Sequence, residues 1–429
     1  MDPLAHMRAA VRQECPMPTM PAAEAAPASA EQPHPAAPRC GHASCASCAA
    51  LARAAHCYHT NVPWALPKCL NARGLRPGAA GELALLSAWW PPSHPPGRRT
   101  RAGVVDEDRR GVLEMCRTGA AACLSDKRQL ATFMEGAGIA SWAPVTALIP
   151  AELEDRGPLA GAAGDKALWF LKHAHIDNNA GVSVHLGRAA CCAAWLALPE
   201  GERGDYVAQR EVPRVLLDAQ GRKLTLRVYV LCVVLAAAMD EADAATGPRA
   251  WALARREFVC RAHPLAYDAE DPDPARHVHS TVGKFVNVDC TPGSDWAPRD
   301  GAWPALISML RDTFTPFLPV LARREVSEAG GAKAASFALL GVDVIVDTDM
   351  RPWLIEVNEM PALAPVLRDD SATAARESVV EDVLAATLDP MLASGRLQGA
   401  EGGGPAAAAG GAWEALASWS GPAGGTGRR

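Results

Sequence analysis

The chain lacks the long apolar segments that mark membrane-spanning and exported proteins. Its longest apolar run, residues 228–239, has twelve residues, which is short of the roughly 20 that a transmembrane helix needs. The N-terminal segment MDPLAHMRAAVRQECPMP contains no continuous apolar region of the kind that secretory signals have. No repeat of solenoid length is present either. We therefore expect a cytoplasmic protein with no membrane partner and a buried strand at residues 228–239.

A strong excess of charge of one sign is also missing. The formal net charge is -6 over 429 residues, so the composition does not indicate a nucleic-acid-binding protein. Recognition of an acidic partner would then need a local basic patch. The thirteen cysteines are an odd number in a chain without an export signal, which favours reduced thiols over a disulfide framework.

Composition divides the chain into a body and two tails. Residues 1–39 are rich in Ala and Pro and residues 397–429 in Gly and Ala, and both are expected to be disordered because they carry few large apolar side chains. Trp413 and Trp419 interrupt the second tail and could dock on the body. Between the tails, strand-like runs alternate with helical stretches, which predicts an α/β or α+β fold. The expected lobes are residues 40–143, 144–205 and 206–396.

Cysteine and histidine side chains gather between residues 40 and 59. Cys45 and Cys48 have the C-x-x-C spacing of many zinc sites. The other spacings match no standard zinc finger, and an Ala- and Cys-rich helix with buried thiols explains the cluster as well. Both interpretations stay open for Cys40, His42, Cys45, Cys48, His56, Cys57 and His59.

The most informative segment, residues 336–363, reads SFALLGVDVIVDTDMRPWLIEVNEMPAL. Two apolar runs, residues 337–346 and 353–357, flank a short polar link, which is typical of a β-hairpin. Pro352 fits as the first residue of the second strand. A hairpin centred on the link would place Ile345 opposite Leu354.

The same hairpin brings three oxygen-bearing side chains together. It places Asp343 opposite Glu356, with Asn358 two residues further on and on the same side of the sheet. Two carboxylates in apolar surroundings repel each other and lose their hydration, which costs free energy unless a cation compensates. Magnesium prefers one or two carboxylates together with phosphate oxygens. The alternative is a hairpin whose acids face water, and the apolar residues on both faces argue against it.

This hairpin resembles the last core motif of the tubulin-tyrosine-ligase-like family, whose fold is of the ATP-grasp type. The Gly-apolar-Asp strand, the acidic turn and the string PWLIEVN carry the resemblance. It implies that Asp343, Glu356 and Asn358 hold magnesium on ATP. It also implies an ATP-grasp-like, multi-lobed α+β body with mixed or antiparallel sheets flanked by helices, extending over about residues 124–392.

Weaker motifs of the same family precede the hairpin in the family's order. An apolar strand ends at Lys172, whose ammonium group either reaches water or binds a fixed anion. The family has a lysine for the ATP phosphates at this place. The next loop has a single glycine, Gly181, where the family has a richer glycine loop. The string YVAQREVP is similar to the family's interlobe linker, which implies that Gln209, Arg210 and Val212 hold adenine. By pattern alone it would be an edge strand stopped by proline.

Residues 221–230 form an alternating strand. Lys223, Thr225 and Arg227 share one face, and the Cα atoms of Lys223 and Arg227 are roughly 13 Å apart. The resemblance implies that Lys223 binds phosphate and that Arg227 stabilises a charged intermediate. Thr225 stands at a nucleotide position where the family has an acid. A half-exposed strand with a wet basic face is the alternative.

Three further positions extend the resemblance. Arg261 stands where a family arginine orients the acceptor. His277 keeps the histidine of a His-apolar-Thr-Asn motif whose last two residues differ here. The string LSDKRQL at residues 124–130 resembles the family's Asp-Lys helix start, and Ser125 or Asp126 is expected to cap that helix whatever its function.

Taken as a whole, the resemblance implies an ATP-dependent carboxylate-amine ligase. With Mg²⁺ bound, ATP would convert a protein carboxylate to an acyl phosphate. The amine of a free amino acid would then attack this acyl phosphate. Lys223, Arg227 and Arg261 are the candidate catalytic residues, tubulin or microtubules the partner, and glutamate the first candidate substrate, with tyrosine and glycine as alternatives. The implied setting is the cytoskeleton, a cilium or a basal body. Two further readings stay open: a degenerate ATP-binding microtubule-associated or regulatory protein, and an ATP-grasp ligase with a non-tubulin acceptor.

Overall fold

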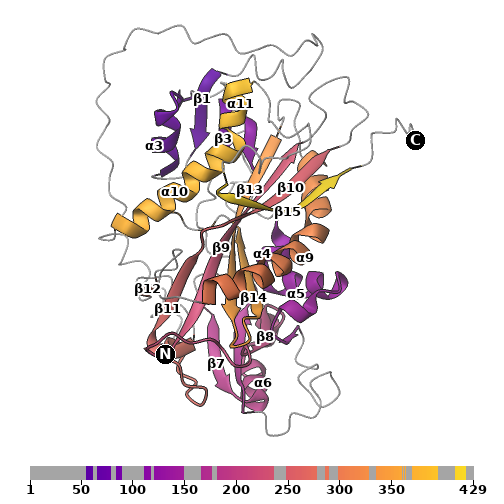
Figure 1. Cartoon of the computed structure of the whole chain (residues 1–429). Coiled ribbons are helices and arrows are strands. Elements are labelled where there is room, and N and C mark those ends of the chain that lie inside the picture. Colours follow the sequence, from indigo (N-terminus) through magenta and orange to yellow (C-terminus); the bar gives the residue numbers. More distant parts are fainter. Residues whose placement is uncertain are drawn as a thin grey trace, which may run out of the picture. The chain divides into compact units, whose positions relative to one another are not determined.

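The computed structural model describes the chain from residue 55 to residue 421, with gaps (Figure 1). The described ranges are 55–60, 65–78, 84–88, 111–116, 120–148, 166–175, 181–235, 248–277, 286–288, 298–327, 335–359, 361, 363, 370–394 and 411–421. The expected N-terminal tail and most of the cysteine cluster lie outside these ranges. Cys57 is described and is buried in a strand, β1, not in a helix. Within the described ranges, no three His, Cys, Asp or Glu side chains are placed to hold a metal ion.

A large mixed sheet carries most of the described chain. Its strand order is β12-β11-β9-β13-β4-β3-β1-β2, with β14 paired to β13 and β10 linking β9 to β15. Pairs among β9 to β15 are antiparallel, and the pairs that join β13, β4, β3, β1 and β2 are parallel. The bounds are β1 (Ala55–Thr60), β2 (Arg76–Pro77), β3 (Ala84–Ala88), β4 (Gly111–Met115), β9 (Arg222–Leu235), β10 (Arg249–Arg255), β11 (Val259–Ala266), β12 (Val286–Val288), β13 (Ala335–Val346), β14 (Pro352–Glu359) and β15 (Trp413–Ser420).

A second sheet of four strands has the order β5-β8-β6-β7. The strands are β5 (Thr146–Ala147), β6 (Leu168–His173), β7 (Val182–Leu186) and β8 (Tyr206–Arg210). Helix α6 (Arg188–Leu196) packs on β6 and β7, and the short α7 (Glu200–Arg203) follows it. Because β8 pairs with β6, this sheet takes in residues on both sides of the lobe boundary expected near Asp205.

Strand β9 lies at the centre of the large sheet and is buried on both faces. The even-numbered residues from Leu224 to Val234 belong to one apolar cluster, and Tyr229, Leu231, Val233 and Leu235 belong to the other. This confirms the buried strand expected from the apolar run as far as Leu235; residues 236–239 lie outside the described ranges. It also excludes the half-exposed strand with a wet basic face, because Lys223 and Arg227 are buried.

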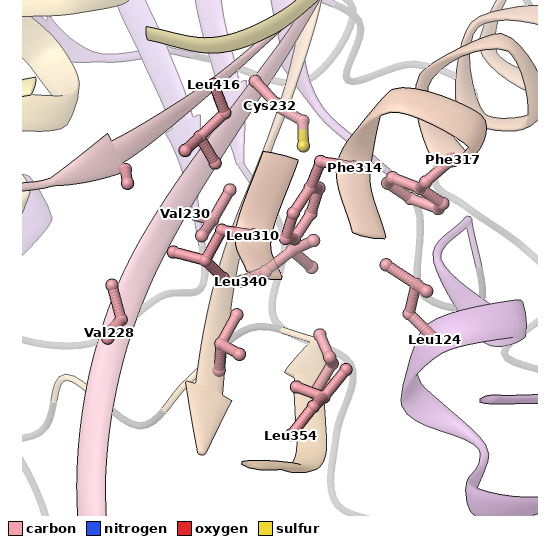
Figure 2. Packing of buried hydrophobic residues seen from close by; sticks show 14 of the residues in the cluster. Leu124, Val228, Val230, Cys232, Leu310, Phe314, Phe317, Leu340, Leu354 and Leu416 are labelled. Carbon is pink, nitrogen blue, oxygen red and sulfur yellow. The ribbon is translucent and has the colours of Figure 1, made fainter. Parts of the chain in front are cut away.

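Helix α9 (Pro298–Ser327) covers the first face, together with α4 (Ala122–Ser125) and α5 (Lys127–Gly136). Figure 2 shows Leu310 and Phe314 of α9 packed near Val230 and Cys232 of β9. Among the described helices, α9 is the one long and apolar enough to cross a membrane by length and composition. Most of its apolar side chains are buried against the sheet, as expected of a core helix, and Val320 is exposed.

The second face is covered by α3 (Ala65–Ala72), α10 (Asp370–Thr387) and α11 (Asp389–Ser394). Arg73, directly after α3, ties them together. Its guanidinium donates to both oxygens of Asp389 at 2.6 and 2.9 Å and to Glu381 at 2.7 Å. The remaining short helices are the 3-10 turn η1 (Ala140–Trp142) and α8 (Pro274–His277). One mixed sheet and one antiparallel sheet, both flanked by helices, confirm the expected α+β, ATP-grasp-like body.

The C-terminal stretch needs a correction. Residues 397–429 are expected to be a disordered tail, but Trp413–Ser420 forms β15, which pairs with β10. Trp413 is 3% exposed and donates its indole N–H to the carbonyl oxygen of Asp382 at 3.1 Å. The buried tryptophan, the ladder with β10 and the buried Leu416 together hold a segment whose neighbours are mostly Gly and Ala.

The predicted hairpin is present as β13 and β14, and Asp343 lies opposite Glu356 as expected. The predicted pairing of Ile345 with Leu354 is wrong, because Val344 faces Leu354 and Ile345 faces Trp353. A β-bulge at Ile355 adds one residue to β14 between these pairs.

Candidate functional site

A pocket between the two sheets collects most of the predicted site residues. Its walls come from β6, β8, β9 and the β13–β14 hairpin, and they bound about 720 Å³ of space including the open mouth. The bulge residue Ile355 contributes to the wall, together with Ile345 and Val212. The predicted residues that line it are Lys172, Gln209, Arg210, Val212, Lys223, Thr225, Asp343 and Glu356.

Three oxygen-bearing side chains converge at one end of this pocket. Asp343 and Glu356 are opposed across the hairpin. The side-chain amide nitrogen of Asn358 lies 3.3 Å from Oδ2 of Asp343 and 3.3 Å from Oε1 of Glu356. Two carboxylates and one amide are too few for an all-protein metal cage. They fit a magnesium ion that takes its other ligands from phosphate and water.

Arg227 forms a buried ion pair with Asp343. Its Nε and Nη2 donate to the two carboxylate oxygens at 2.5 and 2.6 Å, and both side chains are buried. Burial disfavours the ionised carboxylate, but the charge and hydrogen bonds of Arg227 outweigh burial and hold the pKa of Asp343 below its ordinary value. Asp343 therefore stays an anion with a fixed orientation, and Arg227 lies beside the pocket wall, not in it.

Gly341 makes room for this arginine. A methyl group at its Cα would lie 3.0 Å from Cδ of Arg227 and 2.8 Å from Cβ of Pro361. The Gly-apolar-Asp order of the motif thus has a steric reason: the glycine admits the guanidinium, and the aspartate two residues later receives it.

Arg261 and Thr225 are neighbours across β11 and β9. Arg261 is 8% exposed. Burial lowers its pKa, and the nearby charge of Arg227 lowers it further, while Asp343 acts in the opposite direction. Arg261, like Arg227 and Asn358, is adjacent to the pocket-lining residues without being one of them.

Lys172 lies at the pocket end of β6. Its Nζ donates to Oε1 of Gln209 at 2.6 Å, and Nε2 of Gln209 donates to Oγ1 of Thr146 at 3.2 Å. Burial lowers the pKa of Lys172 to about 8, with Lys127 and Lys223 adding to the shift and Glu356 opposing it. An anion that binds beside this amine stabilises its charged, protonated form.

Lys127 is a pocket residue that the sequence analysis missed. Asp126 caps α5 by accepting from the backbone N–H groups of Arg128 and Gln129, as expected. This cap places Lys127 at the start of the helix, where its Nζ lies 3.8 Å from Oε2 of Glu356. The Asp-Lys order was visible in the sequence, but the contact with Glu356 depends on how α5 packs.

Glu211 was missed as well. It is buried, and Lys223 donates to its two carboxylate oxygens at 2.9 and 3.1 Å. His277, also buried, lies with Nδ1 4.0 Å from Oε2 of Glu211, and its Nε2 lies 2.6 Å from the carbonyl oxygen of Asp271. The signal available in the sequence was the position of Glu211, a charged residue directly before the pair Val212-Pro213.

Comparison with known proteins gives two matches. The family model described as "Tubulin-tyrosine ligase family" matches residues 296–394, which include α9, the hairpin and both C-terminal helices. The protein named "Probable tubulin polyglutamylase TTLL9" from Rattus norvegicus is 28% identical over 179 residues. The match covers 39% of this chain and 35% of that protein, so the chain spans about a third of the relative's length.

Proposed function

We propose that the chain, whose residues 296–394 match the tubulin-tyrosine ligase family model, is an ATP-dependent ligase that joins an amino acid to a carboxylate of a protein, with tubulin as the acceptor. The observation that carries this proposal is the pocket itself. It combines the two opposed carboxylates of the hairpin with three lysines from other elements, Lys127, Lys172 and Lys223. A polyanion with a bound divalent cation satisfies both sets of charges, and Mg²⁺–ATP is such a ligand.

Each group then has a part in the reaction. Asp343, Glu356 and Asn358 would hold a magnesium ion, which would supply positive charge to neutralise the phosphates. Lys172 and Lys223, together with Lys127, would hold phosphates. Gln209, Arg210 and Val212 would line the place of the base. Thr225 lies on the β9 side of the pocket, where the ribose is proposed to lie.

Two buried arginines are the residues proposed to act on the acceptor carboxylate. Arg227 and Arg261 place two guanidinium groups next to Asp343. We propose that they stabilise the charge of an acyl phosphate on the acceptor carboxylate, which the amine of a free amino acid attacks. Lys223 would contribute its ammonium group to the same end. The family resemblance suggests these roles, and the charges and positions of the side chains support them.

Glutamate is the proposed amino acid, and tyrosine and glycine are the alternatives. The support is the relative named as a probable tubulin polyglutamylase. The proposed setting is accordingly the cytoplasm, at the cytoskeleton or in a cilium or basal body.

The test is incorporation of labelled glutamate, tyrosine or glycine into purified tubulin with ATP and magnesium. The account predicts that one amino acid is incorporated and that Glu356→Gln lowers the rate by at least about a hundredfold, since an oriented charge at the reacting phosphate is removed. Glu257→Gln is the matched control, because Glu257 is an exposed carboxylate outside the pocket. Equal rates for wild type and Glu356→Gln would contradict the proposed site.

A degenerate ATP-binding protein is the second candidate. Three observations favour it: Thr225 stands where the family has an acid, Lys223 is already paired with Glu211, and Arg227 is already paired with Asp343. Nucleotide binding without incorporation of any of the three amino acids would support it. Incorporation into a protein other than tubulin would instead support a ligase with a different acceptor.

A further inference from the structure

Glu211 places a carboxylate inside the pocket at the side proposed for the base. It lies between β8 and Val212, and its side chain turns inward to Lys223. The side chains of the two residues are 7% and 3% exposed. The proposed reaction gives this carboxylate no role, although burying one is costly without a compensating charge.

The backbone N–H groups of residues 210–212 show what Glu211 does there. The N–H of Arg210 donates to the carbonyl oxygen of Val145 and that of Glu211 to the carbonyl oxygen of Leu168, both at 2.8 Å. The N–H of Val212 instead donates to Oε1 of Glu211, at 3.0 Å. Of these three donors, the one at Val212 is therefore held by a side chain that rotation can remove. The other two are fixed by the fold.

The same carboxylate neutralises Lys223. Both oxygens accept from its Nζ, and the ammonium group also lies 5.1 Å from the centroid of the Phe170 ring. His277 does not compete for the carboxylate. Its Nε2 faces a carbonyl oxygen, which only accepts, so Nε2 carries the proton. Burial lowers the pKa of His277, which favours the neutral ring with a lone pair on Nδ1. Lys223 is thus the cation that compensates Glu211 within the described residues.

We propose that Glu211 is an affinity-setting residue that competes with the nucleotide for its own site. It occupies the backbone donor of Val212 and the ammonium group of Lys223, which the base and the phosphates would use, and it must release both before a nucleotide binds. This inference rests on the proposed function, because it takes ATP to be the ligand. A carboxylate that competes with a polyanion also lowers its affinity through like charge.

The experiment measures binding of Mg²⁺–ATP to the full chain by calorimetry, without tubulin, for wild type, Glu211→Gln and Glu211→Ala. The dissociation constant is expected to fall by roughly tenfold or more in Glu211→Gln, because a charged hydrogen bond no longer has to be broken. Both variants remove the charge that compensates Lys223, but glutamine keeps the shape of the side chain and an oxygen that can accept from the ammonium group, so Glu211→Gln serves if Glu211→Ala unfolds the protein. Asp218→Asn is the matched control: Asp218 also pairs with a cation, Arg222, but does not line the pocket.

The outcomes separate the two claims. Tighter binding in Glu211→Gln with unchanged binding in Asp218→Asn supports the competitor role, also if wild type shows no measurable binding. Equal or weaker binding in Glu211→Gln overturns it and leaves the ATP site intact. If neither wild type nor any variant binds ATP, both the competitor role and the proposed function fail.

Discussion

Two buried ion pairs lie in or beside the pocket. Lys223 pairs with Glu211 and Arg227 pairs with Asp343, and all four side chains are at most 10% exposed. A buried pair contributes little net stability compared with apolar residues of the same size, whereas removing one partner costs about 3–5 kcal/mol. Their value therefore lies in the positions that they fix. Asp343 is held as an oriented anion, and Lys223 is held near the proposed phosphates.

The proposed binding of ATP is expected to depend on pH through Lys172. With a pKa lowered to about 8 by burial, free Lys172 loses its charge as the pH rises from 7 to 9, whereas bound phosphates would keep it protonated. Binding then takes up a proton in this range, so affinity for ATP should fall by up to about tenfold per pH unit above 8. Equilibrium dialysis of labelled ATP across this range checks it.

Lys172→Arg is the control for this effect, because arginine stays charged throughout the range. Its affinity should change less with pH than that of wild type. Parallel curves for the two proteins would contradict the assignment of the proton uptake to Lys172.

Gly341 is expected to be intolerant of even a methyl group. In Gly341→Ala the new Cβ would meet both Pro361 and Arg227, and overpacking of this kind costs about 1–3 kcal/mol. Gly136→Ala is the matched control, because a Cβ at this helical position meets nothing within 4 Å. Urea unfolding of both variants measures the difference, and equal midpoints would show that the space at Gly341 is not needed.

At the scale of elements, the hairpin shows what sequence reasoning reaches and where it ends. The alternation of a strand correctly placed Asp343 opposite Glu356 and Asn358 on the same side. The bulge at Ile355 was not predicted, because an added residue is set by packing around the strand and leaves no periodic signal. Glu211 was missed for a related reason: its partner Lys223 is reached only after the linker has folded back on β9.

The C-terminal strand β15 gives a test at the same scale. Trp413→Ala removes the buried ring and its hydrogen bond to Asp382, and a loss of about 3–5 kcal/mol of unfolding free energy is expected. Trp419→Ala, at a half-exposed position of the same strand, should lose clearly less. Chemical denaturation of both variants decides between a docked strand and a dispensable tail, for which the two losses would both be near zero.

At the scale of the whole molecule, the pocket lies where the small sheet meets the centre of the large one. Strands far apart in sequence supply its walls: β6 and β8 from the small sheet, β9 from the centre of the large sheet, and the hairpin within the matched residues 296–394. The fold class could be predicted from alternating strands and helices. The attachment of β15 and the full set of lysines could not, because both depend on contacts between segments that are far apart along the chain.

The most direct test of the account is the stoichiometry of the reaction with tubulin, magnesium and the amino acid that is incorporated. An acyl-phosphate ligase should form about one ADP and one inorganic phosphate for each amino acid added, with no AMP. Nucleotides and products can be counted together by chromatography and mass spectrometry of tubulin. Formation of AMP and pyrophosphate, or incorporation without cleavage of ATP, would contradict the account.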